Sequence, residues 1–448
     1  MLKNNHTIVK QTALGYPKFI WYPELNHWWV VEAPDRWVEY QPLGARWQRF
    51  ETQARAYPEK VRLVDALTAA EDSAAKHAVL SDESAFAEAL AGADLVGDSF
   101  LPGQTTQPPT PLSNPHPDIA TTFAVPATAA AEWTVRTDGE VRAVLAQARA
   151  AQTPVLPLGG GSNVLFTAPW QGWVLRMAID GIEVLADDGD AVEVVAGAGV
   201  VWHDFVLHTL DAGWGGLENL ALIPGSVGAS PMQNIGAYGT EIQDRFLWLD
   251  AISREDGRLQ RFHPADCAFG YRESVFKTTE RDRWIIVRVA FRLERSAPVS
   301  VSYGALESTL REAGHRPPFT RRQVADAVIA VRRSKLPDPA VLGNAGSFFK
   351  NPVVSAEQHA ALLAEHPDIA AYPLPDGTVK LAAGWLIDRA GWKGHDRGTH
   401  GVHDRQALVL VNRGGARGEE VWQLSAEIQE DVRARFGVEL EREVNPVP

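Results

Sequence analysis

The segment NLALIPGSVGASPMQNIGAYG, residues 219–239, decides how we interpret the fold of this chain. Its glycines alternate with small and hydroxyl residues, a composition that lets the main chain approach a large planar ligand closely. Ser230, Gln233 and Asn234 would supply hydrogen bonds to that ligand. A pair of tight turns in a β-rich domain would have a similar composition, so this segment alone leaves both interpretations open.

A shorter glycine run, Gly159-Gly-Gly-Ser-Asn163, lies between two predicted strands, residues 154–158 and 164–166. In chain order this run is the first glycine segment, and residues 219–239 are the second. Consecutive glycines let backbone amides turn toward a bound anion such as a pyrophosphate without obstruction by a Cβ atom. A Rossmann fingerprint would open a helix at this point, whereas the residues after Asn163 look extended. By itself the run is equally typical of a tight turn.

Composition limits the classes of protein to which the chain can belong. The chain has 448 residues, 45% hydrophobic and 22% charged, which predicts a soluble globular protein of two or three domains. Its formal net charge of −13 disfavours nucleic-acid and membrane partners, because both are polyanionic. The single cysteine, Cys267, provides neither an internal disulfide nor a thiolate metal site. Without a signal peptide or an apolar run of eighteen residues, we expect a cytoplasmic protein with no metal.

The first hundred residues form a separate, tryptophan-rich segment, and residues 101–118, rich in Pro, Thr, Ser and Gln, are predicted to be a linker. Alternating stretches around residues 27–32 and 36–41 predict a hairpin that turns at 33–35, and alanine-rich stretches from about 46 to 91 predict helices. Five of the fifteen tryptophans lie in the first fifty residues: Trp21, Trp28, Trp29, Trp37 and Trp47. They indicate either a small core or a partner interface, and the partner is unknown.

The remainder of the chain predicts an α+β protein. Thr137 caps a predicted helix with Val141, Val144 and Leu145 on one face. Short alternating strands follow to about residue 296. From about residue 300, helical patterns alternate with apolar strands such as residues 407–411, which indicates a second α+β body.

Seven motifs in order along residues 120–444 resemble the UDP-N-acetylenolpyruvoylglucosamine reductase family, in the subgroup with a tyrosine-bearing substrate loop. The motifs are GGGSNVLF, ENLALIPGSVGASPMQNIGAYG, FGYRESVFK, SKLPDP, NAGSFFKNP, KLAAGWLID and QALVLVN. The resemblance implies a two-part FAD-binding region of the vanillyl-alcohol-oxidase (PCMH) type at residues 119–300, followed by an α+β substrate-binding domain at 301–448. Residues 1–100 would be an extension that short family members lack.

The resemblance also implies a reaction in peptidoglycan precursor synthesis. NADPH would reduce FAD, and the reduced flavin would pass a hydride to the enolpyruvyl ether of a UDP-sugar, giving UDP-N-acetylmuramate. The FAD is expected to be non-covalent, because residues 159–163 contain no His or Cys. Two alternatives stay open: another flavin oxidoreductase of the same fold, such as an alcohol oxidase, and a binding or regulatory protein that has kept the fold without the activity.

The resemblance assigns roles residue by residue. Ser347 is implied as the proton donor, and Arg272 with Glu443 as the pair that stabilises the enolate intermediate. The substrate-binding residues implied are Tyr303, Lys335, Asn351 and Tyr372, the last on a loop over the substrate. The cofactor-binding residues implied are Gly159, Gly160, Gly161, Ser162, Asn163, Pro224, Gly225, Gly228, Ala229, Ser230, Asn234, Gly236, Ala237, Tyr238 and Gly239.

One position departs from the family pattern. Family members often carry Arg two residues after the glutamate, where this chain has Asn445. The positive charge near the flavin is therefore either absent or supplied by another residue such as Arg332.

Overall fold

The structure is a computed structural model that describes residues 117–448 throughout and, before them, the backbone of five strands. These strands form one antiparallel sheet in chain order: β1 (Thr7–Gln11), β2 (Lys18–Tyr22), β3 (His27–Ala33), β4 (Arg36–Leu43) and β5 (Arg46–Gln53). The pairing of β3 with β4 confirms the predicted hairpin. The predicted helix was wrong for residues 46–53, which pair along their whole length with β4. The other predicted helical residues and the linker up to residue 116 lie outside the described residues.

The first part of the main body is a small parallel sheet with one helix. Its strand order is β6 (Ala129–Val135), β9 (Trp170–Met177) and β7 (Val155–Leu158). Helix α3 (Asp138–Ala150) packs Val141, Val144 and Leu145 into the core beneath this sheet. The Thr137 side chain accepts a hydrogen bond from the Glu140 amide, so the predicted helix and its cap are confirmed.

The second part is a five-stranded antiparallel sheet. Its order is β10 (Ile182–Asp187), β11 (Ala191–Gly197), β16 (Trp284–Glu294), β14 (Phe246–Ser253) and β15 (Leu259–Phe262). The central strand β16 is buried along nearly its whole length, because both of its edges are paired and both of its faces are covered. Predicted short strands in residues 182–294 are therefore confirmed as one sheet.

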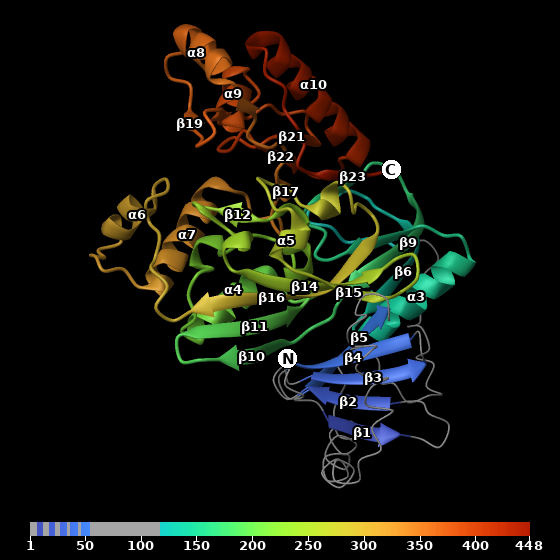
Figure 1. The fold of residues 1–448 in the computed structure, drawn as a ribbon. Helices are drawn as coiled ribbons and strands as arrows, with labels where there is room; N and C mark the ends of the chain where they lie inside the picture. The colour runs from blue at the N-terminus through green and yellow to red at the C-terminus, as the bar shows by residue number, and fades with distance from the viewer. Residues whose placement is uncertain (1–6, 12–17, 23–26, 34–35, 44–45, 54–116) are drawn as a thin grey trace.

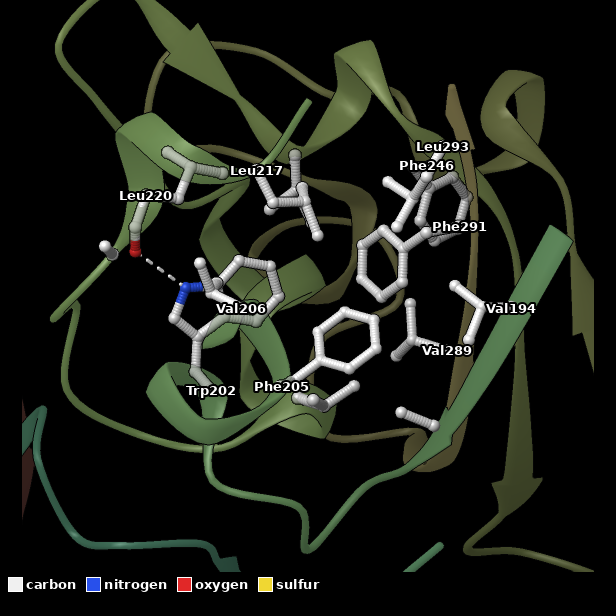
Figure 2. Close-up of a cluster of buried hydrophobic side chains, with 14 of the residues drawn as sticks. Val194, Trp202, Phe205, Val206, Leu217, Leu220, Phe246, Val289, Phe291 and Leu293 are labelled. Atoms are coloured by element: carbon white, nitrogen blue, oxygen red, sulfur yellow. Dashed lines mark hydrogen bonds between the residues drawn. The ribbon is translucent and has the colours of Figure 1, made fainter. Parts of the chain in front are cut away.

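An aromatic core fixes the start of the second glycine segment (Figure 2). Trp202, which begins α4 (Trp202–Asp211), packs against Phe205 and Phe291 with ring centroids 5.9 and 5.8 Å away. Its indole Nε1 donates to the carbonyl of Leu220 at 2.9 Å. The Trp202 amide donates to the carbonyl of Gly225 at 3.0 Å. The two hydrogen bonds therefore fix Leu220 and Gly225, near the start of the segment 219–239.

Several short elements build that loop and its surroundings. They are η2 (Glu218–Leu220), η3 (Val227–Gln233), β12 (Gly236–Ala237), β13 (Thr240–Glu241), η4 (Ile242–Asp244), α5 (Pro264–Cys267) and η5 (Val275–Lys277). The second glycine segment is thus a 3₁₀ helix followed by a narrow hairpin rather than a pair of simple turns.

The two helices that follow residue 300 pack against the antiparallel sheet. Helices α6 (Leu306–Glu312) and α7 (Arg321–Lys335) contribute Leu306, Leu310 and Val328 to the same core as the antiparallel sheet. A second core gathers residues from Ala345 onward together with Phe123, Val125 and Leu165. The apolar faces of α6 and α7 pack against the body that contains the antiparallel sheet, so both helices belong to that body by packing.

The C-terminal body contains two three-stranded sheets and three helices. One sheet has the order β17 (Gly343–Ser347), β22 (Val409–Asn412), β21 (His400–Val402); the other has β18 (Val353–Val354), β20 (Val379–Leu381), β19 (Ala371–Pro373). The helices are α8 (Ala356–Glu365), α9 (Ala383–Arg389) and α10 (Gly418–Phe436). Figure 1 shows these helices at the top and β17 at the junction with the body below. The predicted α+β character is confirmed.

The chain then returns to the first body. Strand β23 (Asn445–Val447) pairs in parallel with β8 (Val164–Phe166), the strand that follows the first glycine segment. The C-terminus consequently lies beside β23 in Figure 1. Within the described part of the chain, no helix is both long and apolar enough to cross a membrane.

Candidate active site

The first glycine segment forms a turn between β7 and β8, as predicted. Gly161 has a φ of +66°, and a Cβ atom there would lie 3.0 Å from the Thr121 Cα. A Cβ on Gly159 would lie 2.4 Å from the Ser226 Oγ. Gly161 therefore needs glycine for its conformation, and Gly159 for the close approach of the second glycine segment.

Gly160 differs from its neighbours. It is exposed, and the nearest atom to a Cβ placed on it would be the Gly225 Cα at 3.9 Å. The protein itself leaves room for a side chain at Gly160. The absence of one keeps the surface of the loop open to a ligand.

The second glycine segment holds itself together with its own polar side chains. Ser230 is buried, and its hydroxyl donates to the carbonyl of Val227 at 2.7 Å. Asn234 has a φ of +43° and is fully buried. Its amide nitrogen donates to the Glu241 carboxylate and the Gly270 carbonyl, at 2.8 and 3.1 Å. The predicted contacts of these two side chains with a cofactor thus compete with bonds inside the protein.

A cavity of about 140 Å³ lies behind the two glycine segments. It is lined by Gly159, Gly228 and Ala229 and by apolar side chains such as Met177, and also by the charged residues Arg254, Glu280 and Asp282. Close by, the hydroxyl of Thr121 is buried and has no hydrogen-bond partner among the described residues. A buried unpaired hydroxyl costs stability unless a ligand or water completes it.

The C-terminal strand brings Glu443 to the same place. The Asn163 amide nitrogen donates to the Gln233 Oε1 and to the Glu443 carbonyl, at 3.1 and 3.3 Å. Gln233 Nε2 in turn donates to the Glu443 carboxylate at 2.9 Å. Asn445 donates through both its backbone and its side-chain nitrogen to the Asn163 carbonyl, each at 3.1 Å. Asn445, which stands where the family often has Arg, therefore fastens the glycine loop.

Arg272 faces the Glu443 carboxylate. Its Nε lies 3.5 Å from the Glu443 Oε1, and its Nη2 donates to the Gly236 carbonyl at 2.6 Å. Arg272 has a φ of +54°, a conformation that a non-glycine residue adopts at a cost of about 1–3 kcal/mol. The strained backbone directs the guanidinium toward the second glycine segment. The predicted pair of Arg272 and Glu443 is thus brought together.

Burial controls the chemistry of Glu443, whose side chain is 13% exposed. Burial raises the pKa of the Glu443 carboxyl above its usual value, while the positive charges of Arg272, Lys277 and Lys350 and the bond from Gln233 oppose that rise. The carboxyl consequently holds its proton to a higher pH than an exposed glutamate would, and a protonated carboxyl can donate a hydrogen bond.

Ser347 lies at the end of β17, beside the segment that carries Glu443. The amide of the next residue, Phe348, donates to the Leu408 carbonyl, and the Glu443 amide donates to the Phe348 carbonyl, both at 2.8 Å. Both hydrogen bonds of Phe348 therefore hold the chain directly after Ser347. Ser347 and Glu443 lie on adjacent backbone segments, with Arg272 opposite Glu443.

A cavity of about 920 Å³ opens beside Glu443. Lys277 and Lys350 line it together with Asn351 and Tyr271. Burial lowers the pKa of the Lys277 ammonium, and nearby Lys350 lowers it further. The cavity thus brings cations and carboxylates together beside Glu443, and the Lys350 ammonium lies 2.5 Å from the Glu441 carboxylate.

The tyrosines predicted to bind substrate gather at another edge of the site. Tyr303 and Tyr372 stack, with ring centroids 6.5 Å apart and an interplanar angle of 24°. Tyr238 meets Tyr303 edge-on at 6.4 Å. Both Tyr303 and Tyr372 are exposed, at 42% and 44%, so their rings are available to a ligand.

The other two predicted substrate-binding residues are placed differently. Asn351 Oδ1 accepts from the Ala383 amide at 3.0 Å, and Asn351 also hydrogen-bonds Tyr271. Lys335 ends α7 and is exposed. Within the described residues, no hydrogen bond or ion pair joins Lys335 to the other predicted substrate residues.

Arg332 adds a cation that is mostly buried. Its Nε donates to the Leu222 carbonyl at 3.2 Å, and it forms no ion pair with a carboxylate in the described part of the chain. Burial lowers the pKa of the Arg332 guanidinium, with Tyr238 and Arg272 close enough to influence it. The prediction that Arg332 supplies the positive charge that family members often carry at the position of Asn445 stays a prediction.

Prediction from sequence missed several residues of this site. Tyr271 and Lys277 lie in the quoted motif around Arg272, Lys350 in the motif of Ser347, and Lys380 at the start of KLAAGWLID. The signal was therefore present in the motifs, but nothing in their spacing distinguished these residues from their neighbours. Among the residues that the structure describes, no three His, Cys, Asp or Glu side chains are placed to hold a metal ion.

Comparison with known proteins relates this arrangement to one family. Residues 338–447 match the model of the C-terminal domain of UDP-N-acetylenolpyruvoylglucosamine reductase, and residues 129–263 match an FAD binding domain. A UDP-N-acetylenolpyruvoylglucosamine reductase of Pseudomonas fluorescens (strain Pf0-1) is 53% identical over 324 residues, which cover 72% of this chain and 95% of the relative. The chain belongs to the UDP-N-acetylenolpyruvoylglucosamine reductase family.

Other members of the UDP-N-acetylenolpyruvoylglucosamine reductase family match similarly. The protein of Burkholderia vietnamiensis (strain G4 / LMG 22486) is 52% identical over 345 residues, 77% of this chain and 99% of the relative. A solved reductase structure from Thermus caldophilus has 25% identity and a TM-score of 0.49, and the match covers 73% of this chain and 96% of that chain.

The residues of this reductase family member fit the FAD that the matched domain implies. The two glycine segments lie so close together that a Cβ at Gly159 would lie 2.4 Å from the Ser226 Oγ. Because residues 159–161 carry no side chains, a ligand on this loop would meet the main chain. The unpartnered Thr121 hydroxyl offers a donor beside Gly161. Residues 159–163 would hold the pyrophosphate, and the cavity lined by Gly228 and Ala229 would take an apolar part of the cofactor.

Proposed function

We propose that this chain catalyses the NADPH-dependent reduction of UDP-N-acetylglucosamine enolpyruvate to UDP-N-acetylmuramate, a cytoplasmic step of peptidoglycan precursor synthesis. The observation that carries the proposal is the approach of Arg272 to the buried carboxyl of Glu443, 3.5 Å apart, where the segment of Glu443 lies beside that of Ser347. Bound FAD would supply the transfer of hydride from NADPH to the terminal vinyl carbon. The protein must then manage the charge and the proton.

Arg272 and Glu443 would stabilise the negative charge that develops beside the substrate carboxylate. A guanidinium provides a permanent charge with a fixed fork of donors. Glu443 would contribute a hydrogen bond, because its raised pKa favours the protonated form that can donate. The two side chains thereby meet the developing enolate with complementary groups.

Ser347 would donate its hydroxyl proton to the carbon next to the carboxylate. A carbanion-like centre is more basic than an alkoxide, so this transfer proceeds downhill, and the serine recovers a proton from solvent. The product then carries one hydride and one proton. General acid catalysis of this kind contributes typically about 10²–10⁴-fold to a rate.

The decisive experiment separates the two half-reactions. For Ser347→Ala we expect flavin reduction by NADPH, measured by stopped-flow absorbance, to stay within about two-fold, while oxidation of reduced enzyme by the enolpyruvyl substrate falls by about 10²–10⁴-fold. Ser355→Ala, which removes a helix cap at α8 in the same body, is the matched control and should leave both steps unchanged. Equal loss of both half-reactions in Ser347→Ala would overturn the role of Ser347.

The competing functions give different results with the wild-type protein. An alcohol oxidase would reduce oxygen and would not need the sugar nucleotide. A binding protein without activity would be colourless, because it would carry no flavin. We expect a yellow protein whose NADPH oxidation depends on the enolpyruvyl UDP-sugar.

A further inference from the structure

The side chain of Arg176 in β9 joins the first glycine segment to the chain that precedes β6. Its Nη1 donates to the carbonyl of Gly159 at 2.8 Å, and its Nη2 donates to the carbonyl of Ala120 at 3.3 Å. Its Nε donates to the Glu132 carboxylate, also at 2.8 Å. A guanidinium is a rigid planar fork of donors, so three bonds hold it in one orientation. Arg176 therefore holds the Gly159 carbonyl in a fixed direction.

A second carbonyl of this loop is also bonded to the protein. The Gly161 carbonyl accepts a hydrogen bond from the Thr122 amide at 3.2 Å and a longer one from the Thr122 hydroxyl at 3.4 Å. A Cβ on Gly161 would lie 3.0 Å from the Thr121 Cα, so residues 120–122 pack directly against the loop. Two carbonyls of the glycine segment thus face Arg176 and this neighbouring stretch.

The direction of each carbonyl decides the direction of the amide that follows it. In a trans peptide the C=O and N–H bonds point in opposite directions, and every peptide bond of this loop is trans. Since the carbonyls of Gly159 and Gly161 face their partners, the amides of Gly160 and Ser162 point away from them. Neither amide donates a hydrogen bond to another group of the described residues. Loop amides left without a partner form a binding site for an anion.

The charge of Arg176 is already paired. Its Nη2 lies 2.7 Å from the Glu132 carboxylate, and both side chains are mostly buried. The carboxylate cancels most of the attraction that the guanidinium would have for an anion beyond the loop. What Arg176 supplies to the loop is therefore the orientation of a peptide group.

We propose that Arg176 is a positioning residue for FAD, which directs the Gly160 amide toward the pyrophosphate through its bond to the Gly159 carbonyl. The pyrophosphate is the only part of FAD that is ionised at neutral pH, so it is the part that unpaired amides would bind. Arg176 lies within residues 129–263, the range that matches an FAD binding domain. The inference depends on FAD binding and is independent of the proposed reaction.

The test measures FAD binding to the deflavinated full chain by fluorescence titration. Arg176→Lys keeps the charge and loses the planar fork. Because an amide that loses its bond to a charged oxygen weakens binding about 10- to 150-fold, the FAD dissociation constant should rise within that range. Phosphorus NMR of the FAD-loaded variant should show a shifted pyrophosphate resonance. Flavin reduction by NADPH at saturating FAD should stay within about two-fold of the wild type.

Arg321→Lys is the matched control, because this guanidinium also bonds two backbone carbonyls, those of Arg295 and Ala297, outside both glycine segments. The control should change neither the FAD dissociation constant nor the phosphorus spectrum. An equal loss of FAD affinity in Arg321→Lys and Arg176→Lys would mean a general effect on folding, and would overturn the inference.

Glu132→Gln separates orientation from charge. It removes the carboxylate and leaves both carbonyl bonds of Arg176 in place, so we expect FAD to bind no more tightly than to the wild type. Tighter binding would mean that Arg176 attracts the cofactor by its charge, and would overturn the inference. Unchanged FAD affinity in Arg176→Lys would overturn it as well, and so would weaker binding with an unchanged phosphorus spectrum.

Discussion

Replacement of Gly160 by Ala isolates the contact between the glycine loop and the cofactor from the stability of the loop itself. A Cβ atom at this exposed position would meet nothing closer than the Gly225 Cα at 3.9 Å, an ordinary van der Waals distance. Gly160 does not have the positive φ that would strain alanine. The free energy of unfolding of the protein without FAD should therefore stay the same or rise by up to about 1 kcal/mol, because alanine reduces the entropy of the unfolded chain.

FAD binding should respond differently. If the loop backbone contacts the pyrophosphate, the added methyl group occupies space that the cofactor needs. Inserting a methyl group into a packed contact costs about 1–3 kcal/mol, which corresponds to an FAD dissociation constant about 5- to 150-fold higher. Fluorescence titration of the deflavinated protein with FAD measures this change, and thermal unfolding without FAD measures the stability.

A contrasting variant removes the ambiguity. A Cβ at Gly401 would lie 2.2 Å from the His395 carbonyl oxygen, far from both glycine segments in the chain and within the C-terminal body. Gly401→Ala should therefore lower stability by about 1–3 kcal/mol without weakening FAD directly. If Gly160→Ala bound FAD as tightly as the wild type, the loop would not be the pyrophosphate site and our reasoning would be refuted.

Three further predictions concern charge and domain organisation. Because burial raises the pKa of Glu443 in the folded state, its stabilising contribution is complete below the ordinary glutamate pKa of about 4.3 and is lost as the pH rises through the raised value. As the pH rises above about 4.3, the melting temperature of the wild type should therefore fall relative to that of Glu443→Gln; a difference that does not change with pH would contradict this. Arg288→Met should cost about 3–5 kcal/mol in urea unfolding, because it removes the guanidinium 2.7 Å from the buried carboxylate of Asp138, whereas Asp250 keeps its ion pair with Arg261 at 2.8 Å; a loss below about 1 kcal/mol would not fit. Residues 117–448 alone should bind FAD and turn over like the full chain, as measured by flavin absorbance and NADPH oxidation, and loss of either would show that the first segment is needed.

Local signals in the sequence predicted the parts of the fold that depend on neighbouring residues. The turn at 159–163 was predictable because glycines interrupt two apolar strands, and the helix after Thr137 because its cap and apolar face agree. Residues 46–53 were misjudged because their strand is defined by pairing with β4, which a helical pattern in the following residues obscured.

The site could be predicted only through the resemblance. No spacing rule places Glu443 beside Gln233 and Asn163, because parallel pairing of β23 with β8 joins residues about 280 positions apart. Likewise, Lys380 is an ordinary strand lysine until the sheet sets it against Tyr271. For Asn234 the sequence does not show that the side-chain amide donates to Glu241 and Gly270 inside the protein, and its contact with the cofactor stays a prediction.

The return of β23 to β8 also orders events during protein synthesis. Domains fold largely from the N-terminus as the chain emerges, so the sheets that carry the glycine segments can form early. Glu443 and its fastening strand emerge after every other part of the site described above. A nascent chain can hence form both glycine segments while the carboxyl of Glu443, which we propose acts on the substrate, is still missing.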